Sequence, residues 1–239
     1  MRLSFITLTN SGYIKYTMNC LKSLEKIGSQ LLPVCYCVGA EGHNRLVSNS
    51  YRSVFIKDDD AKNSEFQTFR KGNWSNITFK KLELIYENLI TNDFVLFTDG
   101  DIVYENPDFL QYLFDNIKDR EILTQNDCMT DNDTSQLCSG FMFIRSTANT
   151  RILFNPLNAQ PFKNIVGWDD QVYVNQIKHK LNFGLLPLDL FPTGQYYYAN
   201  AARLTPYIIH FNWLVGHEKE KKMLEYGKWY MPVSDVNNQ

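Results

Sequence analysis

The stretch FVLFTDGDIVYENP, residues 94–107, indicates both a fold and a site. An apolar run ends at Thr98, two aspartates then flank one glycine, and the chain becomes apolar again. A short apolar run of this kind is typical of a buried strand in an α/β sheet. Because an unpaired buried carboxylate is costly, Asp99 and Asp101 must either lie in water at the tip of this strand or hold a cation.

The segments on both sides of this stretch alternate between strand-like and helix-like patterns. Strands are expected at residues 2–9, 31–40, 53–59, 93–99, 121–127 and 139–146. Helices are expected at 13–28, 77–90 and 108–118, from residue 149, and within 167–181, where Asp169 and Asp170 begin the helix. This alternation predicts one α/β domain over residues 1–239, with a central mixed, mostly parallel sheet flanked by helices.

Composition excludes several classes of protein. The 239 residues are 44% hydrophobic and carry a net charge of −2, so no basic field would attract nucleic acid or an anionic membrane. No apolar run approaches the length of a membrane span, and the first apolar run is too short for a signal peptide. Five cysteines without a CxxC pair are typical of a reducing compartment. We therefore expect a soluble, cytoplasmic protein.

Four segments, in order, resemble the GT-A-fold nucleotide-diphospho-sugar transferase family, which includes plant xylosyl- and arabinosyltransferases and viral enzymes. They are its DxD region, its Ser-Gly-Phe strand beside the donor sugar, its Asp-Gln helix start and its terminal His-x-Asn…Gly…Lys segment. Here these read LFTDGDIVYENP (96–107), SGFMFIRS (139–146), GWDDQVYVN (167–175) and IIHFNWLVGHEKEKKM (208–223). The resemblance implies a GT-A-like fold, with a nucleotide-binding half at 1–105 and an acceptor half with a C-terminal lid at 106–239.

The resemblance also implies a metal site. A nucleotide sugar releases a diphosphate, whose charge a divalent cation such as Mn²⁺ or Mg²⁺ neutralises. Asp101 and Asp99 would be ligands, with Asp99 alternatively bound to ribose hydroxyls. His210 would be the third ligand. A lone histidine in such an apolar setting is more often a satisfied core residue, and it is the resemblance that favours the ligand. Gly100 would let the backbone approach the nucleotide closely.

Further residues are expected to hold the donor, for which UDP-sugar is the favoured candidate. Gly216 and Lys219 would close on the diphosphate together with His217, although the charged run 217–222 could instead be a solvated helix face. Ser139 and Gly140 would lie beside the donor sugar. The remaining candidates for base, ribose and phosphate contacts are Thr7, Thr9, Asn10, Tyr13 and Asp59, with Lys80 or Lys81 directed toward the phosphates.

Asp170 and Gln171 are the predicted catalytic residues. The family resembled retains the anomeric configuration, which requires a carboxylate nucleophile or same-face attack on an ion-pair intermediate. Asp170 would stabilise that intermediate or bind acceptor hydroxyls, while Asp169 would serve as the helix N-cap. Trp168 and Trp213 would form an aromatic wall for a glycan or glycoprotein acceptor.

Three other functions remain open at this level. The DGDIV segment also fits the nucleophile motif of haloacid-dehalogenase-type phosphatases, in which Asp99 and Asp101 would act with Mg²⁺, although that motif usually follows the first strand. A sugar-nucleotide pyrophosphorylase is disfavoured because RLSFITLTNSG (2–12) lacks a glycine-rich basic loop. A catalytically inactive sugar-binding protein would have lost the metal site, yet all three expected ligands are present.

Overall fold

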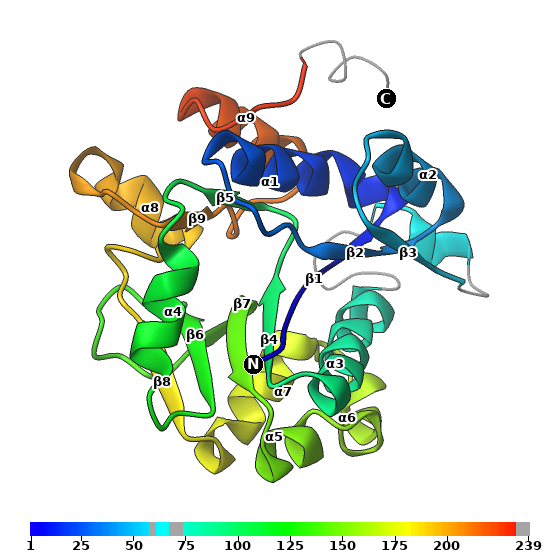
Figure 1. Cartoon of the computed structure of the whole chain (residues 1–239), viewed down its shortest axis with the longest axis vertical. Helices are drawn as coiled ribbons and strands as arrows, with labels where there is room; N and C mark the ends of the chain where they lie inside the picture. Colours follow the sequence, from blue (N-terminus) through cyan, green and yellow to red (C-terminus); the bar gives the residue numbers. More distant parts are fainter. Residues whose placement is uncertain (58–60, 67–73, 233–239) are drawn as a thin grey trace.

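A computed structural model describes residues 1–57, 61–66 and 74–232 of the chain (Figure 1). Its main sheet has seven strands in the order β3-β2-β1-β4-β7-β6-β8. Their bounds are β1 (Leu3–Asn10), β2 (Val34–Val38), β3 (Ser53–Ile56), β4 (Phe94–Thr98), β6 (Ile122–Asn126), β7 (Leu137–Arg145) and β8 (Phe183–Leu186). A second, two-stranded sheet pairs β5 (Ile102–Tyr104) with β9 (Ile208–His210).

Strand direction determines which residues meet at the edge of the main sheet. Neighbouring strands run parallel except β7, which is antiparallel to both β4 and β6. The carboxyl ends of β1, β4 and β6 therefore share one edge with the amino end of β7. A backbone hydrogen bond of 2.7 Å from Asp99 to the carbonyl of Gly140 joins β4 and β7 at this edge. In open α/β sheets this edge is where ligands bind.

Helices cover both faces of the sheet (Figure 1). One face packs against α1 (Ile14–Lys26), α2 (Ala40–Ser48) and α4 (Phe109–Ile117). The other face packs against α3 (Trp74–Thr91), α5 (Ala148–Leu153), α6 (Pro156–Lys163) and α7 (Asp170–Ile177). Two further helices, α8 (Gly194–Asn200) and α9 (His217–Glu225), follow in the C-terminal part. Single 3₁₀ turns occupy η1 (Ser11–Tyr13), η2 (Ala61–Ser64), η3 (Lys178–Lys180) and η4 (Ala201–Arg203).

Burial of β4 on both faces explains its continuous apolar sequence. Val95 and Phe97 belong to the core under α3, whereas Phe94 and Leu96 belong to the core under α1 and α4. A strand that alternated apolar and polar residues would place the polar ones in one of these two cores. The strand therefore delivers Asp99 to the edge from a position fixed by packing on both sides.

The predicted fold class is confirmed, while several elements differ from their predicted bounds. The strand expected at 31–40 covers only Val34–Val38, because Gly39, with φ of +103°, ends it and α2 begins. The sequence did not predict α2, since its only buried residues are Gly42 and Leu46. The two three-residue strands β5 and β9 were also not expected. None of the helices in the described part of the chain is long and apolar enough to cross a bilayer.

Candidate active site

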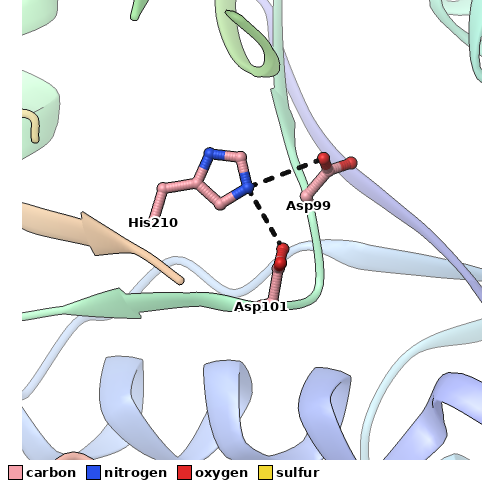
Figure 2. A group of neighbouring side chains, drawn as sticks. All are labelled: Asp99, Asp101 and His210. Carbon is pink, nitrogen blue, oxygen red and sulfur yellow. Dashed lines mark ion pairs between the residues drawn. The ribbon is translucent and has the colours of Figure 1, made fainter. Parts of the chain in front are cut away.

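Asp99, Asp101 and His210 converge at the carboxyl edge of the sheet (Figure 2). Asp99 follows β4, Asp101 precedes β5, and His210 ends β9, where it lies opposite Ile102 of β5. His210 Nε2 is 3.3 Å from Asp101 Oδ1 and 3.8 Å from Asp99 Oδ2, and the three potential ligand atoms lie within 4.8 Å of one another. Two carboxylate oxygens and one imidazole nitrogen form a donor set that fits Mn²⁺ or Mg²⁺.

Two predicted glycines are required by close packing around these residues. A Cβ at Gly140 would overlap the His210 ring and crowd Asp99 Oδ2, so only glycine allows the imidazole to lie against β7. A Cβ at Gly100 would overlap the hydroxyl of Thr17. The close approach that the structure shows at Gly100 is therefore to helix α1.

Lys219 reaches this group of residues from α9. Its ammonium forms an ion pair with Asp101 and a hydrogen bond with the Tyr13 hydroxyl. Gly216, at φ of +54°, starts the helix in a conformation that favours glycine, and its carbonyl accepts a 2.7 Å hydrogen bond from Tyr16. Two residues of this segment were predicted to bind the diphosphate of the sugar donor through their side chains. Of these, Lys219 lies at the site, whereas His217 is exposed to solvent.

Electrostatics keep the Asp101 carboxylate ionised. Burial by itself would raise the pKa of Asp101, but the Lys219 ammonium and His210 outweigh burial and hold this pKa well below its usual range. Burial, together with the charge of Asp101, raises the pKa of Tyr13 well above its usual value. Tyr13 is therefore a neutral hydroxyl between two charged groups.

A second lysine, Lys81, lies between Asp99 and Asp170. Its ammonium is 2.9 Å from Asp99 Oδ1 and 2.6 Å from Asp170 Oδ2. Burial would lower the pKa of Lys81, but these two carboxylates reverse the effect and raise it. The neighbouring Lys80 instead pairs with Glu83 at 3.1 Å on the outer side of α3. Of the two lysines that the sequence left open, the structure brings Lys81 to the site.

The predicted catalytic residues lie in the first turn of α7. Asp169 caps this helix by accepting a 2.9 Å hydrogen bond from the backbone of Val172, which leaves Asp170 directed inward. The Ser139 hydroxyl donates to Asp170 Oδ2 at 2.6 Å, and the Ser139 amide donates to Gln171 Oε1 at 3.3 Å. The start of β7 therefore positions both side chains.

Asp127, which the sequence analysis did not single out, connects Gln171 to the C-terminal segment. Its carboxylate accepts hydrogen bonds from Gln171 at 3.0 Å, Asn212 at 3.2 Å and the Trp213 indole at 3.0 Å. Trp213 is 58% exposed and has a φ of +63°, a conformation that is unfavourable for a bulky residue. The one available signal was the position of Asp127, directly after a strand end at the same edge as Asp99.

The other predicted aromatic, Trp168, is packed against the protein. Its ring stacks on Phe162 with centroids 4.8 Å apart. Trp168 therefore contributes to the packing of α6, while Trp213 remains the aromatic residue exposed beside the site.

The predicted base- and ribose-binding residues of β1 mostly serve local structure. Thr9 accepts a 2.8 Å hydrogen bond from Thr17 of α1, and Thr7 lies on the same face of the strand. The Asn10 side chain caps η1 and donates to two carbonyls of the 61–66 segment. Asp59 lies outside the described residues. Of this group, Tyr13 contacts a candidate metal ligand, since its hydroxyl lies 3.4 Å from Asp101 Oδ2.

The family model for nucleotide-diphospho-sugar transferases matches residues 34–225. The chain therefore belongs to this family. The UDP-galactose:fucoside alpha-3-galactosyltransferase of Dictyostelium discoideum is 24% identical over 288 aligned positions, which cover 97% of this chain. The chain spans 44% of the length of that relative.

Solved structures of glycosyltransferases share the fold, which is GT-A. The galactosyltransferase LgtC, in complex with donor and acceptor sugar analogues, superposes with a TM-score of 0.61 at 14% identity, covering 95% of this chain and 97% of LgtC. GlyE of Streptococcus pneumoniae gives 0.60 at 17% identity, covering 99% and 62%. Mouse xyloside xylosyltransferase 1 gives 0.55 at 14% identity, covering 88% and 98%.

Proposed function

We propose that the protein is a metal-dependent glycosyltransferase that moves a sugar from UDP to a hydroxyl of a glycan or glycoprotein, with retention of configuration. The observation that carries this proposal is the convergence of Asp99, Asp101 and His210 at the ligand-binding edge of a GT-A sheet. A UDP donor is supported by the relative named UDP-galactose:fucoside alpha-3-galactosyltransferase. Family membership gives no support to the alternative of a haloacid-dehalogenase-type phosphatase.

The metal ligands and Lys219 would bind and stabilise the leaving diphosphate. Asp99, Asp101 and His210 would hold Mn²⁺ or Mg²⁺, which when bound supplies a Lewis acid for the leaving diphosphate. Lys219 lies against Asp101 and can exchange this carboxylate for a phosphate oxygen without leaving the site. A buried ammonium that offers three donors suits the growing negative charge of the leaving group.

Lys81, Asp170 and Gln171 would act on the donor sugar. Asp170 accepts hydrogen bonds from Lys81 and Ser139 and is 4% exposed, so its carboxylate is fixed in place. This carboxylate would face the positive charge that develops on the donor sugar, either as a stabilising charge or as a nucleophile. Gln171 is held by Ser139 and Asp127, which leaves its orientation fixed beside Asp170.

The acceptor would bind at the part of the site where Trp213 is exposed. Apolar faces of sugar rings pack on aromatic rings, and this exposed indole is tied through Asp127 to the candidate catalytic Gln171. We also propose a cytoplasmic location, as predicted from the cysteine pattern and from the lack of a signal-peptide or membrane-span pattern; the five cysteines are free thiols in the structure.

A donor screen tests the proposal. Purified protein is incubated with UDP-galactose, UDP-glucose, UDP-xylose or GDP-mannose, and separately with p-nitrophenyl phosphate, each with Mn²⁺, Mg²⁺ or EDTA. Metal-dependent release of UDP supports the transferase, whereas phosphate release from the monoester would support the phosphatase. Proton NMR of the first product formed with a fucoside acceptor then reads the anomeric configuration. Asp170→Asn should slow release of UDP without weakening binding of UDP.

A further inference from the structure

Gln125 is a buried amide in β6 with no assigned role, and it lies directly behind His210. Its side chain has no exposed surface. Its Nε2 atom donates to the carbonyl oxygens of Phe191 at 3.1 Å and Pro192 at 3.2 Å, and its Oε1 atom lies 3.0 Å from His210 Nδ1. The Pro192 carbonyl also accepts the backbone N–H of His210 at 3.1 Å, so a single carbonyl fixes both residues.

These contacts determine which way the amide of Gln125 points. Two carbonyl oxygens can only accept hydrogen bonds, so they require the NH₂ group on their side. The opposite orientation would place three oxygen acceptors together in a buried position, which is costly. The oxygen of Gln125 must therefore face His210.

The orientation of the amide in turn determines the tautomer of His210. An amide oxygen 3.0 Å from Nδ1 is satisfied only if Nδ1 carries a hydrogen. Nε2 then points at Asp99 and Asp101 (Figure 2). Without a cation, a second proton on Nε2 lies toward Asp101; once that proton leaves, Nε2 presents a free lone pair. With Nε2 deprotonated, three electron-pair donors face one point.

The neighbouring thiol of Cys138 does not alter this assignment. Its Sγ atom is 3.5 Å from His210 Nδ1, and a thiol is only a weak hydrogen-bond donor or acceptor. If the thiol donated to an unprotonated Nδ1, that lone pair would also face the oxygen of Gln125. The weak S–H donor cannot offset this buried clash.

We propose that Gln125 is a positioning residue that fixes His210 in the Nδ1–H tautomer and so reserves Nε2 for a divalent cation. The inference rests on the metal site of the proposed function. Partners of this kind behind a metal-binding imidazole typically change metal affinity about 10- to 100-fold when removed. The tautomer, however, exists before any metal binds, and it can be measured in the metal-free protein.

The first experiment is ¹⁵N NMR of the histidine rings in metal-free protein, with His210 assigned by elimination using single variants of His43, His179 and His217. Long-range couplings from the ring carbon protons distinguish the protonated nitrogen from the unprotonated one. We expect Nδ1–H in the parent and loss of this pure tautomer in Gln125→Leu. At a pH where the ring is neutral, a proton on Nε2 instead of Nδ1 in the parent would overturn the proposal, whether or not the protein binds metal or transfers sugar.

The second experiment separates positioning from packing by calorimetry with Mn²⁺ alone and with Mn²⁺ plus UDP. Gln125→Leu should bind Mn²⁺ about 10- to 100-fold more weakly. Gln125→Glu keeps an oxygen toward Nδ1 but directs its second oxygen at the carbonyls of Phe191 and Pro192. Gln125→Glu should therefore be less stable than Gln125→Leu. It should nevertheless retain the tautomer and bind Mn²⁺ more tightly than Gln125→Leu.

Thr150→Val is the matched control. Thr150 is also fully buried, and its hydroxyl donates to the Arg145 carbonyl and accepts from the Thr147 amide, but it lies beyond the opposite end of β7. Its loss should lower the melting temperature and leave the Mn²⁺ affinity within twofold of the parent. If Gln125→Leu and Thr150→Val bind Mn²⁺ equally well, or if metal affinity simply follows stability across the three variants, Gln125 is a packing residue and the proposal is wrong.

Discussion

Lys219 and Asp101 form a buried ion pair between positions that lie 118 residues apart in the sequence. The same carboxylate is one of the three candidate metal ligands, and its other oxygen is 3.3 Å from His210 Nε2. The ammonium and a bound cation would therefore share one aspartate through its two oxygens. This arrangement links α9 to the metal site and leads to the first two predictions.

Asp101→Asn should abolish cooperation between metal and nucleotide. We expect the affinity for UDP in Mn²⁺ to fall by roughly 100-fold, because losing one member of a buried charged contact costs about 2–5 kcal/mol. Titration calorimetry with UDP in Mn²⁺ and in EDTA measures the change. Asp115→Asn, at an exposed position on α4, is the control and should match the parent. If the two variants bound UDP equally well in Mn²⁺, Asp101 would not be a metal ligand.

Lys219→Met should weaken nucleotide binding more than metal binding. Hydrogen bonds to charged groups contribute about 1.5–3 kcal/mol, so UDP affinity should fall roughly 10- to 100-fold while the protein still binds Mn²⁺ alone. The control is Lys222→Met on the same helix, because the Lys222 ammonium pairs with Glu225 at the surface and lies over the rings of Tyr198 and Tyr226. A similar loss in both variants would mean that α9 acts through its overall charge.

Lys81→Met and Lys80→Met form a pair of adjacent substitutions on α3 with opposite expected results. Removing the Lys81 ammonium leaves the carboxylates of Asp99 and Asp170 without their shared partner, so donor hydrolysis should slow by about 10²–10³-fold, as for the loss of one preorganised donor. Lys80→Met should remain within twofold of the parent. Steady-state hydrolysis of UDP-galactose in Mn²⁺ tests both, with circular dichroism to show that the Lys81 variant is folded.

Sequence patterns predicted the parts of the fold that depend on local burial. The apolar run before Asp99 gave β4 because both faces of that strand are buried. The spacing of Phe79, Leu82, Ile85 and Leu89 gave α3, and all four are buried in the core. Asp169 was expected as the N-cap of α7, and its side chain makes that hydrogen bond.

Contacts made by distant or polar segments were not predictable in this way. The pairing of β5 with β9 joins strands of three residues each, too short for a periodicity. Whether Lys80 or Lys81 faces the site depends on the rotation of α3 about its axis. The roles of Gln125 and Asp127 arise from what lies opposite the end of β6, and the local sequence TQND contains no pattern that specifies those partners.

Acid should destabilise the metal-free parent more than Asp101→Asn. The folded-state pKa of Asp101 is held well below its usual range by Lys219 and His210 despite burial. An acid with a depressed pKa contributes stability that is present above its unfolded pKa of about 3.9 and is lost as the pH falls toward the folded value. Urea unfolding in EDTA at pH 5, 4 and 3 should show the larger decline in the parent. Parallel declines would mean that Asp101 is not strongly paired.

Helix α9 should become more protected from hydrogen exchange when nucleotide and metal bind. Near the site it is held to α1 by a 2.6 Å ion pair between Lys15 and Glu220 and by the Tyr16 hydroxyl on the Gly216 carbonyl, side by side with α1 in Figure 1. Lys219 also pairs with Asp101, and the buried side chain of Met223 packs in a cluster with Tyr16. Local opening of α9 must therefore break all of these contacts together. A diphosphate paired with Lys219 would add a further attachment and exclude water from the donor.

The measurement is exchange mass spectrometry of peptides within 208–225, without ligand and with UDP plus Mn²⁺. Tyr16→Phe removes the hydroxyl that holds Gly216 and should speed exchange in the ligand-free protein without preventing protection by ligand. Peptides from α5, on the other face of the sheet, serve as the internal control and should not change. Equal exchange of α9 with and without UDP and Mn²⁺ would mean that the helix is a fixed wall of the site, so that donor closure would have to come from elsewhere in the chain.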